Sequence, residues 1–534
     1  MDPANLYKSQ KAPQFFTQYL PWFIMILGIF VILSTFQSYG ITWDEMVQNN
    51  YAKMVLKYYS SFFQDESCNT YKNLYLYGPL FELICTVVYS TTGFAEYETR
   101  HFLIACSAFL AVIALYKTGR LFEHRFVGLF AILMLVFLPQ FYGHSFNNSK
   151  DIPFACAFCW SMYFICKIHT GENQKISSYL FCALSIGITL TLRIGGFLLL
   201  CFFLASQTIA YFTFYQKSCA RGKFILSTGK NFFLVLGLSW LIMIIFWPWT
   251  HKAPISRPLE AFFSAVHFQE IYVTIFEGKH FYSNELPRYY LSKYILITTP
   301  PLTLLFFLIG LYASLRKILF SYRSKDSFLF QMALLWLFFP ILFVAVSRSN
   351  LYDGMRHFLF VLPPLAIIAA CGIAYTMDLL VAYTKQTRFA VPLFLLLPLF
   401  PLVDYIQLHP YQSTYFNFFA GGTSRAWLDY ETDYWLSSYK EAAEWINERA
   451  KEQKDRKFVV LLVANKSSRL CAEYYLLPNV ELHSFTQKSE PIPMVFDYYI
   501  ATTRLGMHNN FPELPIVHAI GRQGAIYCVI KKWE

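Results

Sequence analysis

The chain has 534 residues, of which 56% are hydrophobic and only 14% are charged. Soluble proteins have about 25% charged residues, so this composition excludes an ordinary soluble protein and predicts an integral membrane protein. The formal net charge of +11 does not indicate a nucleic-acid partner, because the basic residues lie in short loops between apolar runs and form no basic face.

Apolar segments recur along residues 1–408. A helix needs about 20 apolar residues to cross the hydrocarbon core of a bilayer. Runs of about that length begin near Tyr19, Arg100, Arg125, Ile152, Ser178, Phe197, Asn231, Tyr294, Phe328, His357 and Phe389. The sequence therefore predicts a polytopic α-helical domain with about eleven transmembrane helices.

Basic residues in alternate short loops predict the orientation of these helices. The positive-inside rule places such loops in the cytoplasm. They contain Lys8, Lys11, Lys117, Arg120, Lys217, Arg316, Lys317 and Lys385. The N-terminus is then cytoplasmic, and an odd number of spans puts the C-terminal domain outside.

Two long loops, residues 40–99 and 247–293, are expected at the outer face. In the first loop, Met46–Phe63 has apolar residues at helical spacing, which is typical of a helix that lies on the membrane surface. Gly78–Tyr89 is apolar but too short to span, so we expect a second interfacial or re-entrant helix there.

Residues 409–534 predict a small soluble α/β domain. Ser438-x-x-Glu441 fits a capping box at the start of a helix. Short β-rich segments follow at Phe458–Val463, Val480–His483, Tyr498–Thr502, Val517–Ile520 and Ile526–Ile530, the last two as a hairpin. Cys471 and Cys528 both fall in this domain, and their spacing leaves open whether they pair.

Three acids at the outer face are candidates for chemistry. Asp44 and Glu45 come directly after the first predicted span, and Asp151 opens the fourth. Carboxylates next to lipid need a reason. They are interpreted either as helix N-terminal acids that face the helix dipole, or as a general base and its neighbours, or as metal ligands.

Several cations at the outer ends of the spans run against the positive-inside rule. Each one alone could contact a lipid headgroup or extend to the interface, but together they could hold a phosphate at the membrane face. They are Arg193, Arg288, Lys293, Arg348 and Arg356.

Five short segments together resemble the GT-C glycosyltransferases, and within them the protein O-mannosyltransferase and aminoarabinose transferase group, often called family 39-like. The segments are Trp43-Asp44-Glu45, Lys150-Asp151-Ile152-Pro153, Glu285–Tyr290 before Thr299-Pro300-Pro301, Tyr352–His357, and His409-Pro410-Tyr411 with Tyr415-Phe416-Asn417. The resemblance runs over most of the chain and is carried by the order of these segments and by their common placement outside.

This resemblance implies roles for individual residues. Asp44 would be the base, Glu45 its partner and Asp151 the second acid of the fold. The donor would be a sugar on a polyprenyl phosphate. Many relatives have a cation near the donor phosphate in the first loop, where this chain has Tyr77-Gly78-Pro79-Leu80, so Lys72 is the expected substitute.

We therefore expect an inverting glycosyltransferase that moves a sugar from a polyprenyl-phosphate donor to a hydroxyl of a lipid, glycan or protein acceptor. The phosphate would be held by Arg288, Lys293, Arg356, Arg193 and Lys72. Whether Asp44 and Glu45 bind a divalent metal ion is left open by the sequence. The alternatives are a transporter or lipid-linked sugar flippase, and a non-catalytic assembly protein. By resemblance, a bacterial inner membrane is the expected location.

Overall fold

The computed structural model describes residues 19–171, 175–216, 221–266, 270–384, 387–453, 455–463, 466–485 and 495–533. Of the basic residues that predict the orientation, Lys8, Lys11, Lys217 and Lys385 lie outside these ranges.

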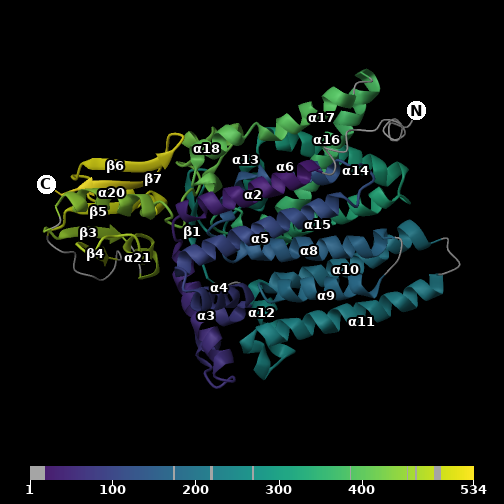
Figure 1. The fold of residues 1–534 in the computed structure, drawn as a ribbon, viewed down its shortest axis with the longest axis horizontal. Helices are drawn as coiled ribbons and strands as arrows, with labels where there is room; N and C mark the ends of the chain where they lie inside the picture. The colour runs from purple at the N-terminus through teal and green to yellow at the C-terminus, as the bar shows by residue number, and fades with distance from the viewer. Residues whose placement is uncertain are drawn as a thin grey trace.

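The protein is an integral, multi-pass membrane protein with a small sheet domain at one end of a helical body (Figure 1). Within the described ranges, 8 helices are long and apolar enough to cross a membrane. They are α2 (Leu20–Thr35), α5 (Glu96–Gly119), α8 (Asp151–Thr170), α10 (Phe197–Ala210), α11 (Arg221–Phe246), α14 (Pro301–Phe320), α15 (Lys325–Ser347) and α16 (Leu362–Thr384), some lengthened by flanking 3-10 or π turns.

Three of the eleven predicted spans differ from this pattern. The run near Arg125 forms α6 (Val127–Val136), which is 10 residues long and is followed by a separate helix, α7 (Pro139–His144). The run near Ser178 forms α9 (Ile176–Leu190), whose 15 residues rise about 22 Å, less than the roughly 30 Å of hydrocarbon. The run near Phe389 is divided by prolines into α17 (Thr387–Leu396), a 3-10 turn and α18 (Leu402–Leu408).

Helices α14 and α16 pack closely because each has a glycine at their contact. A Cβ on Gly310 would lie 1.8 Å from the carbonyl oxygen of Ile368, and one on Gly372 would lie 1.9 Å from that of Phe306. Small residues allow this approach of backbones in transmembrane helix pairs. The pair fixes the start of α16, where a 3-10 turn, Arg356–Val361, carries a predicted site residue.

The two long loops form surface structure at the end of the body that carries the sheet domain. The first contains α3 (Trp43–Ser60) and α4 (Leu80–Thr92), close to the predicted surface helices, and α3 runs across the membrane helices (Figure 1). The second contains α12 (Ser256–Val266), a hairpin of β1 (Val273–Phe276) and β2 (Lys279–Tyr282), and then α13 (Tyr290–Thr298). The hairpin was not predicted from sequence.

The C-terminal domain contains a five-stranded sheet in the order β4-β3-β5-β7-β6. Strand β3 (Phe458–Val463) pairs in parallel with β4 (Val480–Phe485) and β5 (Tyr498–Thr502), and β7 (Ala525–Lys532) pairs antiparallel with β5 and with β6 (Ile516–Arg522). The helices are α19 (Thr423–Ala426), α20 (Tyr439–Glu452) and α21 (Lys466–Glu473). All five predicted strands are confirmed, and Cys471 and Cys528 are free and buried.

The predicted capping box at Ser438 is wrong, although α20 does begin at the next residue. Its two members have other partners. The backbone N–H of Ser438 donates to Asp433 Oδ2 at 2.8 Å, and Glu441 pairs with the guanidinium of Arg522.

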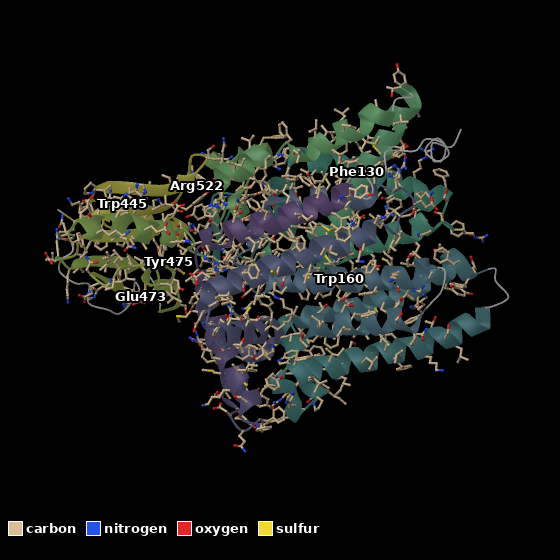
Figure 2. The ribbon with its side chains drawn as sticks, in the orientation of Figure 1. Phe130, Trp160, Trp445, Glu473, Tyr475 and Arg522 are labelled. Carbon is tan, nitrogen blue, oxygen red and sulfur yellow. The ribbon has the colours of Figure 1, made fainter. Side chains whose placement is uncertain are left out.

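Polar contacts tie this domain to the helical body. Arg522 Nε donates to the carbonyl oxygen of His409 at 3.0 Å, and the backbone N–H of Ile41 donates to the hydroxyl of Tyr475 at 3.1 Å. Figure 2 shows Arg522 and Tyr475 on the side of the domain that faces the helices. The domain therefore rests on the segment that leads into α3.

Candidate active site

Asp44 and Glu45 begin helix α3 but have different surroundings. Glu45 is buried: its Oε2 accepts from the backbone N–H of Thr42 at 2.8 Å and lies 3.2 Å from His101 Nε2, and its Oε1 is 3.9 Å from Arg100 Nε. Asp44 keeps 36% of its side chain exposed. The helix-capping interpretation therefore describes Glu45, and Asp44 is the carboxylate that remains accessible.

The start of α3 is fixed against the C-terminal domain. A Cβ on Gly40 would lie 2.2 Å from the carbonyl oxygen of Ser437, so only glycine allows the two backbones to come this close. Trp43 packs against the core of the C-terminal domain, and its ring lies 5.0 Å from the guanidinium of Arg504. These contacts fix the segment that leads into Asp44 against the C-terminal domain.

A chain of charged side chains runs from Asp44 to the C-terminal domain. Arg356 Nη1 lies 3.4 Å from Asp44 Oδ2, and Arg356 Nη2 lies 3.3 Å from Asp353 Oδ2. The other oxygen of Asp353 is 2.8 Å from Arg504 Nη2, on the loop that follows β5. Asp353 is 1% exposed, so one buried carboxylate orients both guanidinium groups.

Aromatic rings enclose the guanidinium of Arg356. Its central carbon lies 5.2 Å from the ring centroid of Tyr352, 5.0 Å from that of Trp435 and 5.8 Å from that of Tyr434. Its Nε is buried and has no hydrogen-bond partner in the described part of the chain. A cation in such apolar surroundings binds an anion more strongly than one in water.

Asp151 holds a second arginine at the same face. Its Oδ1 is 2.7 Å from Arg193 Nη2, its Oδ2 accepts from Asn148 Nδ2 at 2.9 Å, and its side chain is 2% exposed. Because both oxygens have partners, the geometry gives Asp151 the role of positioning Arg193.

Lys150 is the cation that sequence reasoning missed. Its ammonium lies 5.1 Å from the ring centroid of Tyr77, in the stretch where the expected first-loop cation is missing. Burial lowers the pKa of Lys150, the charge of Asp44 raises it, and the guanidinium groups of Arg193 and Arg356 lower it again. Lys150 therefore lies among the other charges of the site. The sequence did contain a signal for this role, because Lys150 directly precedes the candidate acid Asp151.

Gly78 explains how the first loop reaches these cations. A Cβ there would lie 2.0 Å from the carbonyl oxygen of Thr191, two residues before Arg193. Burial raises the pKa of the Tyr77 hydroxyl, and the charges of Arg193 and Arg356 lower it. Lys150, Arg193, Arg356 and Tyr77 thus lie in the same charged region as Asp44, and Arg356 contacts it directly.

A buried network of polar side chains connects the helices beneath Asp44 and Lys150. Arg100 of α5 forms an ion pair with Glu82 of α4, and Ser149 Oγ donates to Glu82 Oε1 at 2.8 Å. With the contacts of Arg100 to Glu45, this network connects α3, α4, α5 and the segment before α8.

The chain is similar to known proteins in part of its sequence and in its fold. Residues 77–249 match a family model described as dolichyl-phosphate-mannose-protein mannosyltransferase. The structure is similar to ArnT from Cupriavidus metallidurans bound to undecaprenyl phosphate, with 14% identity and a TM-score of 0.52 over 96% of this chain and 98% of that chain.

It is also similar to the archaeal oligosaccharyltransferase AglB from Archaeoglobus fulgidus in complex with an inhibitory peptide and a dolichol-phosphate. The identity is 14% and the TM-score 0.53, over 86% of this chain and 64% of that chain. The chain thus spans less than two thirds of the length of the archaeal protein. A comparison with curated protein sequences gave no match.

The fold is therefore GT-C-like, as predicted, and residues 77–249 resemble the mannosyltransferase family.

The family match covers one part of the site. Tyr77, Lys150, Asp151 and Arg193 lie within the matched residues, and Asp44 lies before them. The fold likeness, which extends over 96% of the chain, covers the remainder.

The other predicted phosphate-binding cations lie in different surroundings. Lys293 forms an ion pair with Glu277, and its ammonium lies 5.8 Å from the ring of Phe276. Arg288 is exposed, and Lys72 is exposed with its ammonium 5.8 Å from the ring of Tyr71. Their roles at a phosphate stay predictions, and the structure groups only Arg193 and Arg356, with Lys150, around Asp44.

The predicted metal site at Asp44 and Glu45 does not fit this arrangement. Glu45 is buried, and its two carboxylate oxygens already contact Thr42, Arg100 and His101. Across the described ranges, no group of three or more His, Cys, Asp or Glu side chains is placed to hold a metal ion. We therefore derive no step through a metal.

Proposed function

We propose that this protein is an inverting glycosyltransferase that moves a sugar from a polyprenyl-phosphate donor to an acceptor hydroxyl at the outer face of a membrane. The observation that carries the proposal is the accessible carboxylate of Asp44, beside Arg356 and among three cations. In this proposal the membrane is a bacterial inner membrane, with the C-terminal domain outside.

The cations fit the leaving group. When the bond between the anomeric carbon and the phosphate oxygen breaks, negative charge grows on the phosphate. Arg356 and Arg193 can donate paired hydrogen bonds to phosphate oxygens, and Lys150 adds a compact positive charge. Fixed donors aimed at developing charge are the usual way in which proteins stabilise such transition states.

Asp44 fits the acceptor. A hydroxyl is a poor nucleophile until its proton is being removed, and a carboxylate within hydrogen-bond reach can accept that proton. The acceptor oxygen would attack the anomeric carbon from the side opposite the phosphate and give its proton to Asp44. The configuration at that carbon is then inverted, the phosphate leaves on the lipid, and no covalent intermediate with the protein forms.

Mass spectrometry of host cells with and without the gene tests this function. Envelope glycolipids, glycans and glycoproteins of the two strains would be compared, and the deleted strain complemented with the wild-type gene. We expect one glycosylated product to disappear on deletion and to return on complementation. Its lipid-linked donor should accumulate in the deleted strain. If every glycosylated product persists and only the distribution of a lipid-linked sugar across the membrane changes, the protein is a flippase.

A further inference from the structure

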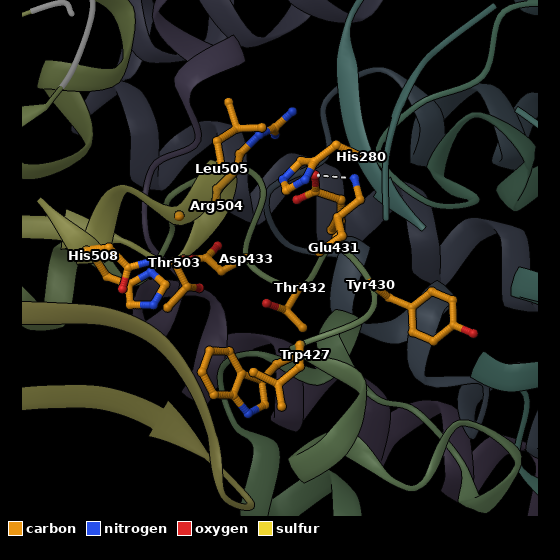
Figure 3. A pocket seen from close by; sticks show the side chains of 14 residues that line it. His280, Trp427, Tyr430, Glu431, Thr432, Asp433, Thr503, Arg504, Leu505 and His508 are labelled. Atoms are coloured by element: carbon orange, nitrogen blue, oxygen red, sulfur yellow. Dashed lines mark hydrogen bonds between the residues drawn. The ribbon is translucent and has the colours of Figure 1, made fainter. Parts of the chain in front are cut away.

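A cavity lies at the junction of the C-terminal domain and the loops of the helical body (Figure 3). Its volume is about 280 Å³, far more than the roughly 10–15 Å³ that one water needs. Three segments form its walls: residues 427–433, residues 503–509 after β5, and the β1–β2 hairpin through Ile275 and His280. None of the predicted phosphate-binding cations lines it.

The charged groups of these walls are engaged elsewhere. Asp433 accepts from the backbone N–H groups of Ser437 and Ser438, at 3.0 and 2.8 Å. Glu431 accepts from the backbone N–H of Ile275 at 3.2 Å, and burial raises its pKa. Arg504 donates to the carbonyl oxygen of Tyr434 and pairs with Asp353. The cavity therefore holds no free cation among its described residues.

Neutral polar and aromatic groups remain for a ligand. The side chains of Thr432, His508 and Trp427 face the same space (Figure 3). Within the described ranges, His508 Nδ1 is buried without a hydrogen-bond partner, and Thr432 lines the cavity with 8% of its surface exposed. The indole of Trp427 offers an apolar face, and Asn509 adds an exposed amide.

The wall after β5 has an uncommon backbone. Leu505 has φ of 53° and Gly506 has φ of 70°, both in the left-handed region, and side chains such as that of leucine rarely adopt it. Such strain is retained where the surrounding structure uses it, and ligand-binding loops are common places. Arg504, which pairs with Asp353, directly precedes this turn.

We propose that the junction cavity binds a neutral, polyhydroxylated group, namely a sugar ring of the acceptor, so that the acceptor is a glycan or glycolipid. This proposal rests on the proposed function and deepens it. An aromatic face with neutral donors and acceptors around it suits a sugar ring, which has apolar C–H faces and hydroxyl edges. A phosphate does not suit the cavity, because Glu431 and Asp433 line it and its one guanidinium is paired.

Position supports the same assignment. Arg504 lines the cavity, and through Asp353 it reaches Arg356 and Asp44. A sugar ring in the cavity would thus lie on the C-terminal side of this charged chain, and the lipid phosphate on the membrane side.

Saturation-transfer NMR on the full-length protein in lipid nanodiscs tests the proposal without any donor. The probes are methyl glycosides of hexoses, N-acetylhexosamines and pentoses, and short peptides that contain Ser or Thr. We expect at least one glycoside, and no peptide, to receive saturation. Loss of one hydrogen bond in Thr432→Val should weaken that binding roughly two- to tenfold, and Trp427→Ala should remove it.

Two controls separate the possible outcomes. Thr70→Val, at an exposed position of the first loop, and Asp44→Asn should both leave glycoside binding unchanged. The proposal is overturned if no glycoside binds, if only peptides bind, or if Thr432→Val and Trp427→Ala bind like the wild type. Because Asp44→Asn is measured here by binding alone, the proposed transfer reaction can fail while the cavity still binds sugar, and the reverse also holds.

Discussion

The two sides of Asp353 differ in the charges that they present. On the membrane side, Arg356 contacts Asp44, and Arg193 and Lys150 lie in the same charged region. On the side of the C-terminal domain, a cavity is lined by carboxylates and one guanidinium group that are already paired, with neutral groups between them. The comparison shows how one buried carboxylate can join a site suited to an anionic leaving group to a site suited to hydroxyl groups.

The largest effect is expected at Asp44. Asp44→Asn keeps the size of the side chain and removes the proton acceptor, and a general base contributes typically 10²–10⁴-fold to a rate. Turnover should fall by about that factor, while affinity for the lipid phosphate stays the same. Single-turnover transfer assays measure the rate, with Asp65→Asn, at an aspartate of the same loop that pairs with Lys57, as the matched control. Near-normal turnover in a folded Asp44→Asn protein would leave Asp44 as a helix-terminal acid only.

The second-largest effect is expected at Lys150, on affinity for the lipid phosphate. Lys150→Met retains the length of the side chain and removes its charge. A charge-assisted hydrogen bond is worth about 1.5–3 kcal/mol, so affinity for undecaprenyl phosphate should fall roughly 10- to 150-fold. Native mass spectrometry in nanodiscs can measure it, with Lys72→Met as the control. If Lys72→Met weakens binding and Lys150→Met does not, the first-loop prediction is right and the geometric assignment is wrong.

The pH dependence of binding sharpens the assignment of Lys150. Burial lowers the pKa of Lys150 below that of an ordinary lysine. The protonated form binds phosphate, so affinity should be constant below the lowered pKa and should fall as pH rises through it. A polyprenyl-phosphate sugar, which has a phosphodiester that does not titrate in this range, is the probe. In Lys150→Arg this decrease should disappear. The same pH profile in both proteins would show that another group titrates.

The smallest effect on the reaction is expected at Glu45. Glu45→Gln leaves Arg100 with one carboxylate instead of two and weakens a buried network, which should cost about 1–3 kcal/mol of folding stability. Its melting temperature should therefore decrease, while turnover changes less than tenfold. A loss of turnover as large as that of Asp44→Asn, without a change in melting temperature, would make Glu45 a partner in the chemistry.

Sequence reasoning predicted those parts of the molecule that depend on local pattern. The membrane class, α3 and the five strands follow from composition and periodicity. Two four-residue patterns, Thr42-x-x-Glu45 and Ser438-x-x-Glu441, show the limit. The first caps its helix. In the second, Asp433 and Arg522 bind the groups that a capping box would use. Distant partners decide between equal local patterns.

Several contacts of the site could not be predicted for the same reason. Asp353 and Arg504 meet only because the C-terminal domain docks on the segment before α3. Lys150 reaches the first loop only because Gly78 lets that loop approach Thr191. Lys293 lies in the first turn of α13, but Glu277 of the unpredicted β1–β2 hairpin pairs with it. Such contacts depend on tertiary packing, which spacing along the chain does not encode.

Photo-crosslinking with a diazirine analogue of undecaprenyl phosphate tests directly whether the lipid phosphate binds beside Lys150 and Arg356. The reactive group would sit beside the phosphate, and labelled peptides of the full-length protein in nanodiscs would be mapped by mass spectrometry. We expect labels at Tyr77–Phe81, at Ser149-Lys150 and at Tyr352–Arg356, and we expect excess unlabelled lipid to abolish all of them. Labels confined to the lipid-facing surfaces of α2 and α11, or to the junction cavity, would contradict it.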